Sequence, residues 1–333
     1  MTWMLTGGAG YIGAHVLRAL RMAGERVVVL DDLSTGDPRR VPAGVPLVVA
    51  SVLDGQRVTR VLREHAVDGV IHLAGKKAVE ESVRLPLRYY HENAEGVRRL
   101  LQAMADAEVR RLVFSSSAAV YAPPTTPLVT EEAPTVPQSP YGRSKLVGEW
   151  MVADAARSQG IGAVSLRYFN VVGNATPELA DRGRSNLFPR VLDALRDARR
   201  PTVFGLDYPT PDGSGVRDYI HVADLADAHV SATGLTARPG HTILNVGCGR
   251  GYSVLEVLRA FAERTGLDTS PEILPRRAGD AASVVADPRR AAEVLGWRAR
   301  HDLADMVASS WEAEVALDTA LLEATDPAAA TSA

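Results

Sequence analysis

A tyrosine and a lysine stand four residues apart in the segment Tyr141-Gly-Arg-Ser-Lys145. The segment reads as the start of a helix, and this spacing places the phenol and the ammonium on one helix face. A free tyrosine has a pKa near ~10 and is a poor base at neutral pH, but a fixed cation beside it stabilises the phenolate. Ser117, the last serine after an apolar strand, could offer its hydroxyl to the same substrate oxygen. The Tyr141/Lys145 pair alone also fits an exposed helix surface, and Ser117 alone also fits a turn. Whether these residues are catalytic therefore depends on the other motifs of the chain.

A glycine-rich loop follows the first apolar run, at Thr6-Gly-Gly-Ala-Gly-Tyr-Ile-Gly13. Glycines at 7, 10 and 13 suit a tight turn, a close approach of the backbone to a pyrophosphate, and close packing of helix on strand. Exposed N–H groups at a helix start favour the phosphate charge. Because the loop lies between a predicted strand and a predicted helix, it indicates dinucleotide binding rather than an ordinary turn.

Two carboxylates, Asp31 and Asp32, end the second apolar run eighteen residues after Gly13. This is close to the ~20-residue spacing expected of the carboxylate that binds ribose. A carboxylate there accepts the ribose hydroxyls of NAD and repels the extra phosphate of NADP. The pair also fits a turn, and both interpretations hold together if only one carboxylate contacts ribose. The expected cofactor is NAD.

Alternating apolar runs and amphipathic stretches in the first half must position these groups. The expected strands are Trp3–Leu5, Arg26–Leu30, Leu47–Val49, Gly69–Leu73, Arg111–Ser115 and Ala163–Tyr168. The expected helices are His15–Ala23, Val58–His65, Leu87–Ala105 and Tyr141–Gln159. Strands rich in Val, Ile and Leu that are separated by helices favour a parallel sheet covered on both faces. The pattern predicts an α/β fold with a doubly wound, Rossmann-type parallel sheet.

The second half predicts a smaller α/β domain for the substrate. From about Val171 we expect a loop over 173–185, a helix at Leu187–Ala198, a strand at Thr202–Phe204 and turns over 206–215. The runs Asp218–Val230 and Thr242–Val246 read as helix and strand. The expected division is a dinucleotide-binding domain at 1–170 with a return of 216–246, a discontinuous substrate domain at 171–324, and a disordered tail at 325–333.

Composition excludes several classes of protein. The chain has 333 residues, 46% of them apolar, which is ample for two packed domains. Its 37 Lys and Arg residues against 40 Asp and Glu give a net charge of -3, so we expect no nucleic-acid partner. The single cysteine, Cys248, cannot form an internal disulfide, which favours the cytoplasm. We expect no signal peptide and no membrane span. His72 and His221 lack neighbours at metal-ligand spacing, so no metal site is expected.

Together these motifs resemble the extended short-chain dehydrogenase/reductase family. The resemblance rests on the glycine loop, the serine run Ser115–Ser117, the Tyr141/Lys145 pair and Leu166–Asn170. Three further segments, Val70–Val79, Pro137–Lys145 and Phe204–His221, resemble the nucleotide-sugar 4-epimerase branch of that family. The likeness covers about Met1 to Glu314.

The resemblance implies that the chain interconverts UDP-galactose and UDP-glucose by transient oxidation at sugar C4, with NAD as cofactor. Tyr141 would be the base at the 4-hydroxyl, Lys145 would hold its pKa down and bind the nicotinamide ribose, and Ser117 would share the hydrogen bond. It also implies a homodimer that pairs through the helices matching Leu87–Ala105 and Tyr141–Gln159.

The same resemblance implies two sets of binding residues. The cofactor set is Gly7, Gly10, Tyr11, Ile12, Gly13, Asp31, Asp32, Leu33, Ser34, Thr35, Gly36, Ser51, Val52, Leu73, Ala74, Gly75, Lys77, Asn93, Ser115, Tyr141, Lys145 and Phe169. The UDP-hexose set is Lys77, Ser117, Tyr141, Asn170, Asn186, Leu187, Thr202, Phe204, Arg217, Arg277, Asp280 and Val284. Arginines suit a diphosphate because the guanidinium fork matches phosphate oxygens.

The chain departs from the family pattern at three places. Ala50-Ser51 stands where the family has a Gly-Asp pair on adenine, which predicts weaker retention of NAD. The segment Arg276–Asp280 lacks the usual glutamate. Val284 stands where a bulky tyrosine limits the room beside the sugar's 2-position, so we expect the N-acetylhexosamine pair to be accepted as well.

Two alternatives remain open. A nucleotide-sugar 4,6-dehydratase needs an Asp-Glu pair just after the serine run, where this chain has Ala118-Ala119. A non-catalytic NAD-binding regulator on the same fold typically loses the tyrosine or the lysine, and this chain keeps both.

Overall fold

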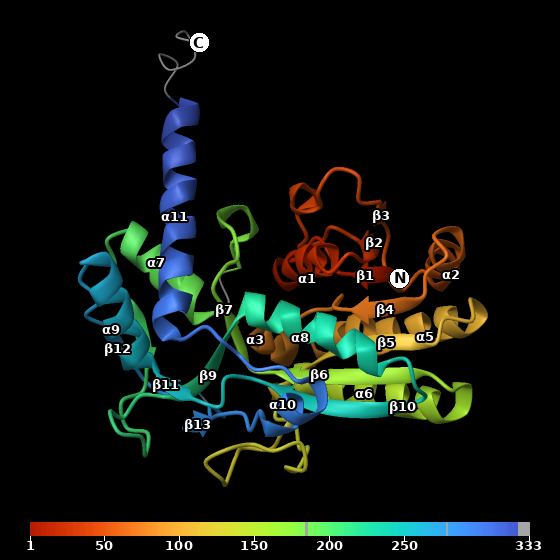
Figure 1. The fold of residues 1–333 in the computed structure, drawn as a ribbon. Coiled ribbons are helices and arrows are strands. Elements are labelled where there is room, and N and C mark those ends of the chain that lie inside the picture. The colour runs from red at the N-terminus through yellow and green to blue at the C-terminus, as the bar shows by residue number, and fades with distance from the viewer. Residues whose placement is uncertain (184–185, 278, 326–333) are drawn as a thin grey trace.

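The computed structural model describes residues 1–183, 186–277 and 279–325, with side chains to residue 317. Its centre is a seven-stranded sheet in which neighbouring strands pair in parallel (Figure 1). The strand order is β10 (Gly240–Val246), β6 (Gly162–Tyr168), β5 (Arg111–Ser117), β4 (Gly69–His72), β1 (Thr2–Thr6), β2 (Arg26–Asp31) and β3 (Leu47–Val49). The chain leaves β1 toward β2 and β3 on one side, and later adds β4, β5, β6 and β10 on the other. The gap between β1 and β4 is therefore the topological switch point, where ligands bind in such sheets.

Helices cover both faces of this sheet. One face carries α1 (Tyr11–Met22), α8 (Val222–Leu235) and α10 (Arg289–Leu295), and the other carries α2 (Gly55–Glu64), α5 (Gly96–Asp106) and α6 (Pro140–Gln159). Within β1, Trp3 and Leu5 join the first core while Met4 joins the second, because successive side chains of a strand point to opposite faces. The predicted doubly wound fold is confirmed.

Helix α6 has clear start and stop signals, which fix where its first turn lies. The Ser139 hydroxyl accepts a hydrogen bond of 3.1 Å from the Gly142 N–H, and Pro140 takes the first helical position. Gly160 ends the helix in a left-handed conformation at φ 66°. Tyr141 is thereby held in the first turn, at the carboxyl end of the sheet.

The predicted helix Leu87–Ala105 is more complex than expected. The chain runs through α3 (Val79–Arg84), α4 (Pro86–Tyr89) and a π-helical turn, η2 (Tyr90–Glu95), before α5. Asn93, inside η2, is buried and donates to the Lys76 carbonyl and the Ser144 hydroxyl. A π-turn redirects a side chain without ending a helix, and here it aims Asn93 at the loop after β4.

A smaller unit holds a second sheet, in which β7 (Asn170–Val172), β9 (Val216–His221), β11 (Gly251–Ser253) and β13 (Ser283–Val284) pair around β9. A third, two-stranded sheet joins β8 (Thr202–Phe204) to β12 (Glu272–Leu274). Helices α7 (Leu187–Arg196), α9 (Val254–Thr265) and α11 (Leu303–Thr325) pack over the second sheet, and α11 projects beyond the body (Figure 1). The short helices are η1 (Pro38–Arg40), η3 (Ala118–Val120) and η4 (Pro177–Leu179).

The chain crosses between the units at His221. The prediction of helix over Asp218–Val230 is wrong at its start, because residues to His221 form β9 and the helix begins at Val222. Buried Tyr219 and Ile220 pair with Asn170 and Val171 of β7, and this long-range pairing outweighs local helical tendency. The predicted disordered tail lies outside the described residues except for Thr325, which ends α11.

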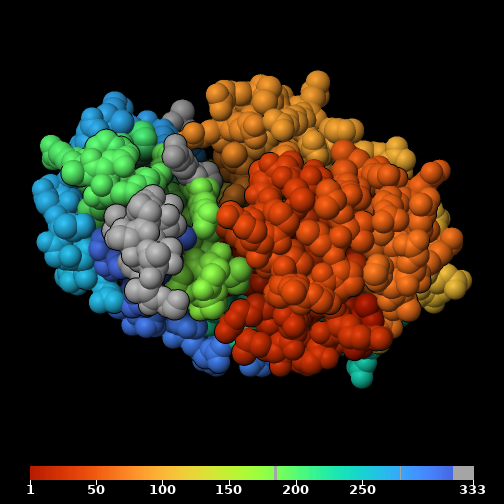
Figure 2. Space-filling view, turned by 90° about the horizontal axis from the view of Figure 1, so that it is seen from above, coloured from red at the N-terminus to blue at the C-terminus, as the bar shows by residue number. Residues whose placement is uncertain are grey.

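In the view from above, the N-terminal residues drawn in red and orange lie beside the green and blue residues of the smaller unit (Figure 2). Among the described residues, no helix combines the length and the apolar character needed to cross a membrane.

Candidate active site

A cavity of about 1090 Å³ opens at the carboxyl ends of the parallel strands. Its wall includes Gly7 after β1, Asp31 at the end of β2, Leu73 after β4 and Ser117 at the end of β5. The smaller unit contributes the opposite wall. Most residues of both predicted binding sets line this one cavity, so the fold brings together groups from distant parts of the chain.

The glycine loop leaves a backbone cradle with no room for side chains. A Cβ on Gly13 would lie 2.1 Å from the Gly7 carbonyl oxygen. Helix α1 starts after Gly10 without a side-chain cap, so no capping side chain occupies its first N–H groups. Unfilled donors at a helix N-terminus bind phosphate, and this cradle therefore fits the pyrophosphate of a dinucleotide.

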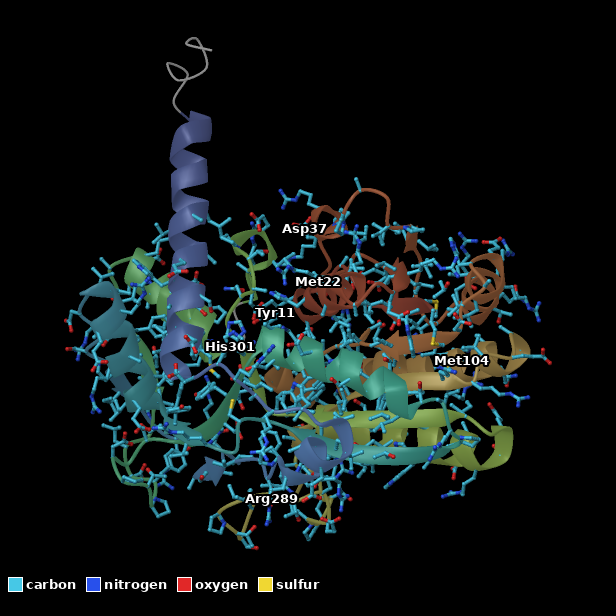
Figure 3. All side chains as sticks on the ribbon, in the orientation of Figure 1. Tyr11, Met22, Asp37, Met104, Arg289 and His301 are labelled. Atoms are coloured by element: carbon cyan, nitrogen blue, oxygen red, sulfur yellow. The ribbon has the colours of Figure 1, made fainter. Side chains whose placement is uncertain are left out.

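Tyr11 ties this loop to the smaller unit. Its hydroxyl donates a hydrogen bond of 2.5 Å to the Gly173 carbonyl oxygen, just after β7. Figure 3 shows Tyr11 in the middle of the molecule, where the two units meet, close to the base of α11. This hydrogen bond joins the glycine loop to the smaller unit.

The two carboxylates after β2 are in different environments. Asp31 is buried, and its two oxygens accept hydrogen bonds of 2.9 Å from the N–H groups of Ala9 and Leu33. Burial raises the pKa of Asp31, and the two backbone hydrogen bonds oppose that shift. Asp32 is exposed and accepts a hydrogen bond from the Ser34 N–H. Both line the cavity, but Asp31 is the carboxylate whose orientation is fixed.

Ser51 lines the adenine end of the expected cofactor site. Its hydroxyl oxygen accepts a hydrogen bond of 3.2 Å from the Leu53 N–H, so the remaining hydroxyl proton is what it can offer a ligand. A single donor is a weaker anchor than a carboxylate.

Ser117, Tyr141 and Lys145 all line the cavity. Tyr141 and Lys145 are both buried, and Ser117 hydrogen-bonds the Tyr141 side chain. The Lys145 ammonium donates a hydrogen bond of 2.9 Å to the Ser115 carbonyl oxygen. Burial raises the pKa of Tyr141 and the Ser117 hydroxyl opposes that shift. Burial lowers the pKa of Lys145 to about 8, against the opposing effect of Glu149. At neutral pH the lysine is therefore mainly charged, and the phenol needs added positive charge before it can act as a base.

The smaller unit supplies polar groups to the far end of the same cavity. Asn170, Asn186, Arg217 and Asp280 line it together with Val284. The Arg217 guanidinium lies 3.7 Å from the Asp280 carboxylate, so a cation and an anion share this end.

Some expected residues do not line the cavity. They are Leu33, Gly36, Asn93, Leu187, Thr202, Phe204 and Arg277. Arg277 instead lies 3.4 Å from the Glu80 carboxylate, and its guanidinium lies 3.9 Å from the Phe204 ring centroid. Gly36 packs against the Asp31 carboxylate, and a Cβ at this position would lie only 2.7 Å from it. Asn93 contacts residues next to the cavity instead. Its side-chain oxygen accepts a hydrogen bond from the Lys76 N–H, and its amide group donates one to the Ser144 hydroxyl.

Several lining residues have no signal in the sequence. Arg40, Lys76, Asp181 and Arg182 all contribute to the wall. Lys76 donates to the Ser34 hydroxyl at 3.1 Å, and Arg40 donates to the Ala180 carbonyl at 2.6 Å. These contacts join loops far apart in the chain, so no short pattern identifies them.

Known proteins share both units. Residues 3–247 match the NAD dependent epimerase/dehydratase family. The chain is 46% identical over 322 residues to the UDP-glucose 4-epimerase of Azospirillum brasilense, covering 93% of this chain and 91% of that protein. A crystal structure of the UDP-glucose 4-epimerase from Stenotrophomonas maltophila with NAD and formylated UDP-arabinopyranose matches with a TM-score of 0.92 and 42% identity, over 96% of this chain and 99% of that one. A structure of the Bifidobacterium longum UDP-glucose 4-epimerase with NAD+ and UDP has a TM-score of 0.89 and 38% identity, over 95% and 98%.

Proposed function

The chain belongs to the NAD dependent epimerase/dehydratase family, and we propose that it interconverts UDP-galactose and UDP-glucose by transient oxidation at sugar C4. The observation that carries this proposal is one cavity in which a glycine cradle, a buried Tyr141–Lys145 pair and the polar end around Arg217 meet. The glycine cradle fits a dinucleotide, and the far end offers a guanidinium to a diphosphate.

Each residue in the acid–base group has a distinct task. Tyr141 takes the proton of the 4-hydroxyl and later returns it, while Ser117 orients the phenol through their hydrogen bond. Lys145, fixed on the Ser115 carbonyl, adds the positive charge that favours the phenolate. When bound, NAD⁺ would supply the hydride acceptor for C4 of the sugar and the positive charge of its nicotinamide ring. The overall reaction would be redox-neutral, because substrate and product are epimers of the same oxidation level.

The binding roles divide between the two units. Gly7, Gly10 and Gly13 would hold the pyrophosphate of NAD, and Asp31 would accept its adenosine ribose hydroxyls. Arg217, with Arg277 when it leaves Glu80, would bind the UDP diphosphate. Residues 1–170 together with α8 and β10 would thus serve the cofactor, and the remaining unit the sugar nucleotide.

The dehydratase alternative is not favoured. Ala118 and Ala119 follow Ser117 and line the cavity, so the position where a dehydratase needs acid and base carries methyl groups.

We also propose that two chains pair in the cytoplasm through the helices of Leu87–Ala105 and Tyr141–Gln159, which correspond to α4, η2, α5 and α6. Helix α4 packs on α6, and Leu87 and Trp150 on these two helices are 80% and 60% exposed. Large apolar side chains gathered on neighbouring helices mark an interaction surface. A Leu87→Asp/Trp150→Asp variant should be monomeric by light scattering. Met22→Asp, at a 72% exposed site on α1, is the control and should leave the dimer intact.

Proton NMR of the purified protein with UDP-galactose and no added reductant tests the activity. Appearance of UDP-glucose supports the proposal. An unchanged spectrum from NAD-loaded protein would overturn it.

A further inference from the structure

Three consecutive serines of β5 contact three residues of α6 that are spaced four apart. Ser117 hydrogen-bonds Tyr141, and the Ser115 carbonyl accepts from Lys145. The Ser116 hydroxyl donates to Glu149 at 2.5 Å. Because positions i, i+4 and i+8 share a helix face, Tyr141, Lys145 and Glu149 form one column against the strand. The proposed mechanism uses the first two members and leaves Glu149 without a role.

Glu149 is also held by Arg167 of β6, which pairs in register with Ser116 of β5. The Arg167 Nε and Nη2 atoms donate to the two carboxylate oxygens at 2.8 and 2.5 Å. The side chains of Arg167 and Glu149 are only 4% and 3% exposed. A fully buried ion pair is costly to desolvate and contributes little net stability. This pair lies one helical turn after Lys145, so we look for its role in the proposed reaction and not in stability.

We propose that Glu149 is a positioning residue of the reaction: clamped by Ser116 and Arg167, its carboxylate keeps the Lys145 ammonium charged and α6 in register with β5, so that Tyr141 can lose its proton. This inference rests on the function proposed above for Tyr141 and Lys145. Burial pulls the pKa of Lys145 down, and Glu149 is the charged group that opposes this. Without the carboxylate, less of Lys145 would carry charge at neutral pH.

Among the described residues, four further titratable groups lie around this column, and these four are neutral between pH 7 and 10. The charged side chains of Glu131 and Arg157 lie farther out, beside Tyr121 and His241. His72 of β4 lies near Lys145, and burial lowers its pKa to about 3. His241 of β10 lies near Glu149, and burial lowers its pKa as well. Burial raises the pKa of Tyr121, whose ring lies 4.8 Å from Arg167, to about 12. Burial also raises the pKa of Tyr168 on β6. A titration over this range therefore reports Lys145.

The chain offers a direct measurement, because it contains three lysines, Lys76, Lys77 and Lys145. In ¹³C-lysine-labelled apoprotein the Lys145 Cε signal should titrate well below the ordinary lysine pKa of ~10.4, and Glu149→Gln should move its midpoint down by about one further pH unit. In the epimerase assay the alkaline limb of kcat/KM should move in the same direction by a similar amount. An unmoved Lys145 midpoint would overturn the inference.

Two further variants separate positioning from simple loss of stability. Val152→Ala removes buried apolar atoms from the same helix and should lower Tm without moving the Lys145 midpoint. If Glu149→Gln alone does not fold, because Arg167 is left buried and unpaired, Glu149→Gln/Arg167→Gln removes both charges and should still lower the midpoint. The NMR titration needs no substrate, so failure of the proposed epimerase activity would show in the assay and leave this readout intact.

Discussion

Gly7 lies so close to Ala74 that a Cβ on the glycine would stand 2.8 Å from the alanine's backbone nitrogen. This contact joins the loop after β1 to the loop after β4, across the switch point of the sheet. We predict that Gly7→Ala forces the two loops apart and removes NAD from the purified protein. The cofactor content, measured by absorbance after denaturation, should fall at least about tenfold.

A second glycine provides the control for this substitution. Gly24, like Gly7, has a positive φ, but a Cβ there would meet nothing within 4 Å. Both alanine variants carry the strain of a left-handed backbone, about 1 kcal/mol, and only Gly7→Ala adds the clash. Gly24→Ala should lower Tm by a few degrees and retain NAD. If both variants lose the cofactor equally, strain and not the cradle is responsible.

Tyr141→Phe should keep the fold and the bound NAD while lowering turnover of UDP-galactose by at least about 10²-fold, the lower end of a general base's usual contribution. The change removes one oxygen from a buried ring, and the ring's packing, including its edge contact with Tyr89, is retained. Turnover and NAD content are measured on the same preparation. Activity within a few-fold of the parent would assign the proton transfer elsewhere.

NAD should bind at least about 10²-fold more tightly than NADP. Asp31 and Asp32 both face the cavity, and two like charges ~4 Å apart repel by about 4 kcal/mol at an effective dielectric constant of ~20. Calorimetric titration of apoprotein with both cofactors measures the ratio. Asp31→Asn should reduce the discrimination more than Asp32→Asn, because only the Asp31 carboxylate is fixed by two backbone donors. Equal affinities in the parent would contradict the assignment.

The large sheet could be predicted because its signals are local. Arg26–Asp31, for example, is a short apolar run between helical patterns, and from Val27 onward it is buried on both faces. The short strands β7, β11 and β13 have no such signal, since two or three residues form them only by pairing with β9. The π-helical turn at Tyr90–Glu95 depends in the same way on contacts of Asn93 with distant residues.

The residues of the site likewise fall into those with a local sequence signal and those placed by long-range contacts. Motifs confined to a few residues, such as the glycine loop and the Tyr141–Lys145 pair, are visible in the chain. Contacts between loops are not, and these place Lys76 and Arg40 in the wall and turn Arg277 toward Glu80. The column Tyr141–Lys145–Glu149 could be predicted only in part. Its four-residue spacing is visible in the sequence, but the ion pair between Glu149 and Arg167 depends on the tertiary structure.

Stability should fall as the pH drops from about 6.5 to 4, because several buried histidines resist protonation. Burial lowers the pKa of His15, His221 and His229 to about 4 and that of His72 to about 3. The unfolded chain binds protons below its histidine pKa of ~6.5 while the folded chain does not, so the free energy of unfolding decreases on acidification. Each histidine contributes a slope of at most about 1.4 kcal/mol per pH unit.

Urea denaturation between pH 7 and 5 measures this slope. His229→Gln should reduce the pH slope of the free energy of unfolding by up to the contribution of one histidine, since the His229 ring is fully buried on α8. His91→Gln, at an exposed position of η2, is the matched control and should leave the slope as it is. A parent whose stability is flat over this range would contradict the prediction.

The range of accepted substrates should depend on Val284. This residue lines the cavity and pairs in register with Arg217 of β9, so it lies at the end assigned to the sugar nucleotide. A side chain of three carbons leaves room where a tyrosine would fill it, and we expect UDP-N-acetylgalactosamine to be accepted beside UDP-galactose. The ratio of their kcat/KM values should stay below roughly 10³, about 4 kcal/mol in transition-state terms. Val284→Tyr should lose the acetylated substrate and keep the other, whereas Val284→Ala should keep both. A parent that discriminates more strongly would mean that neighbouring side chains already close this space.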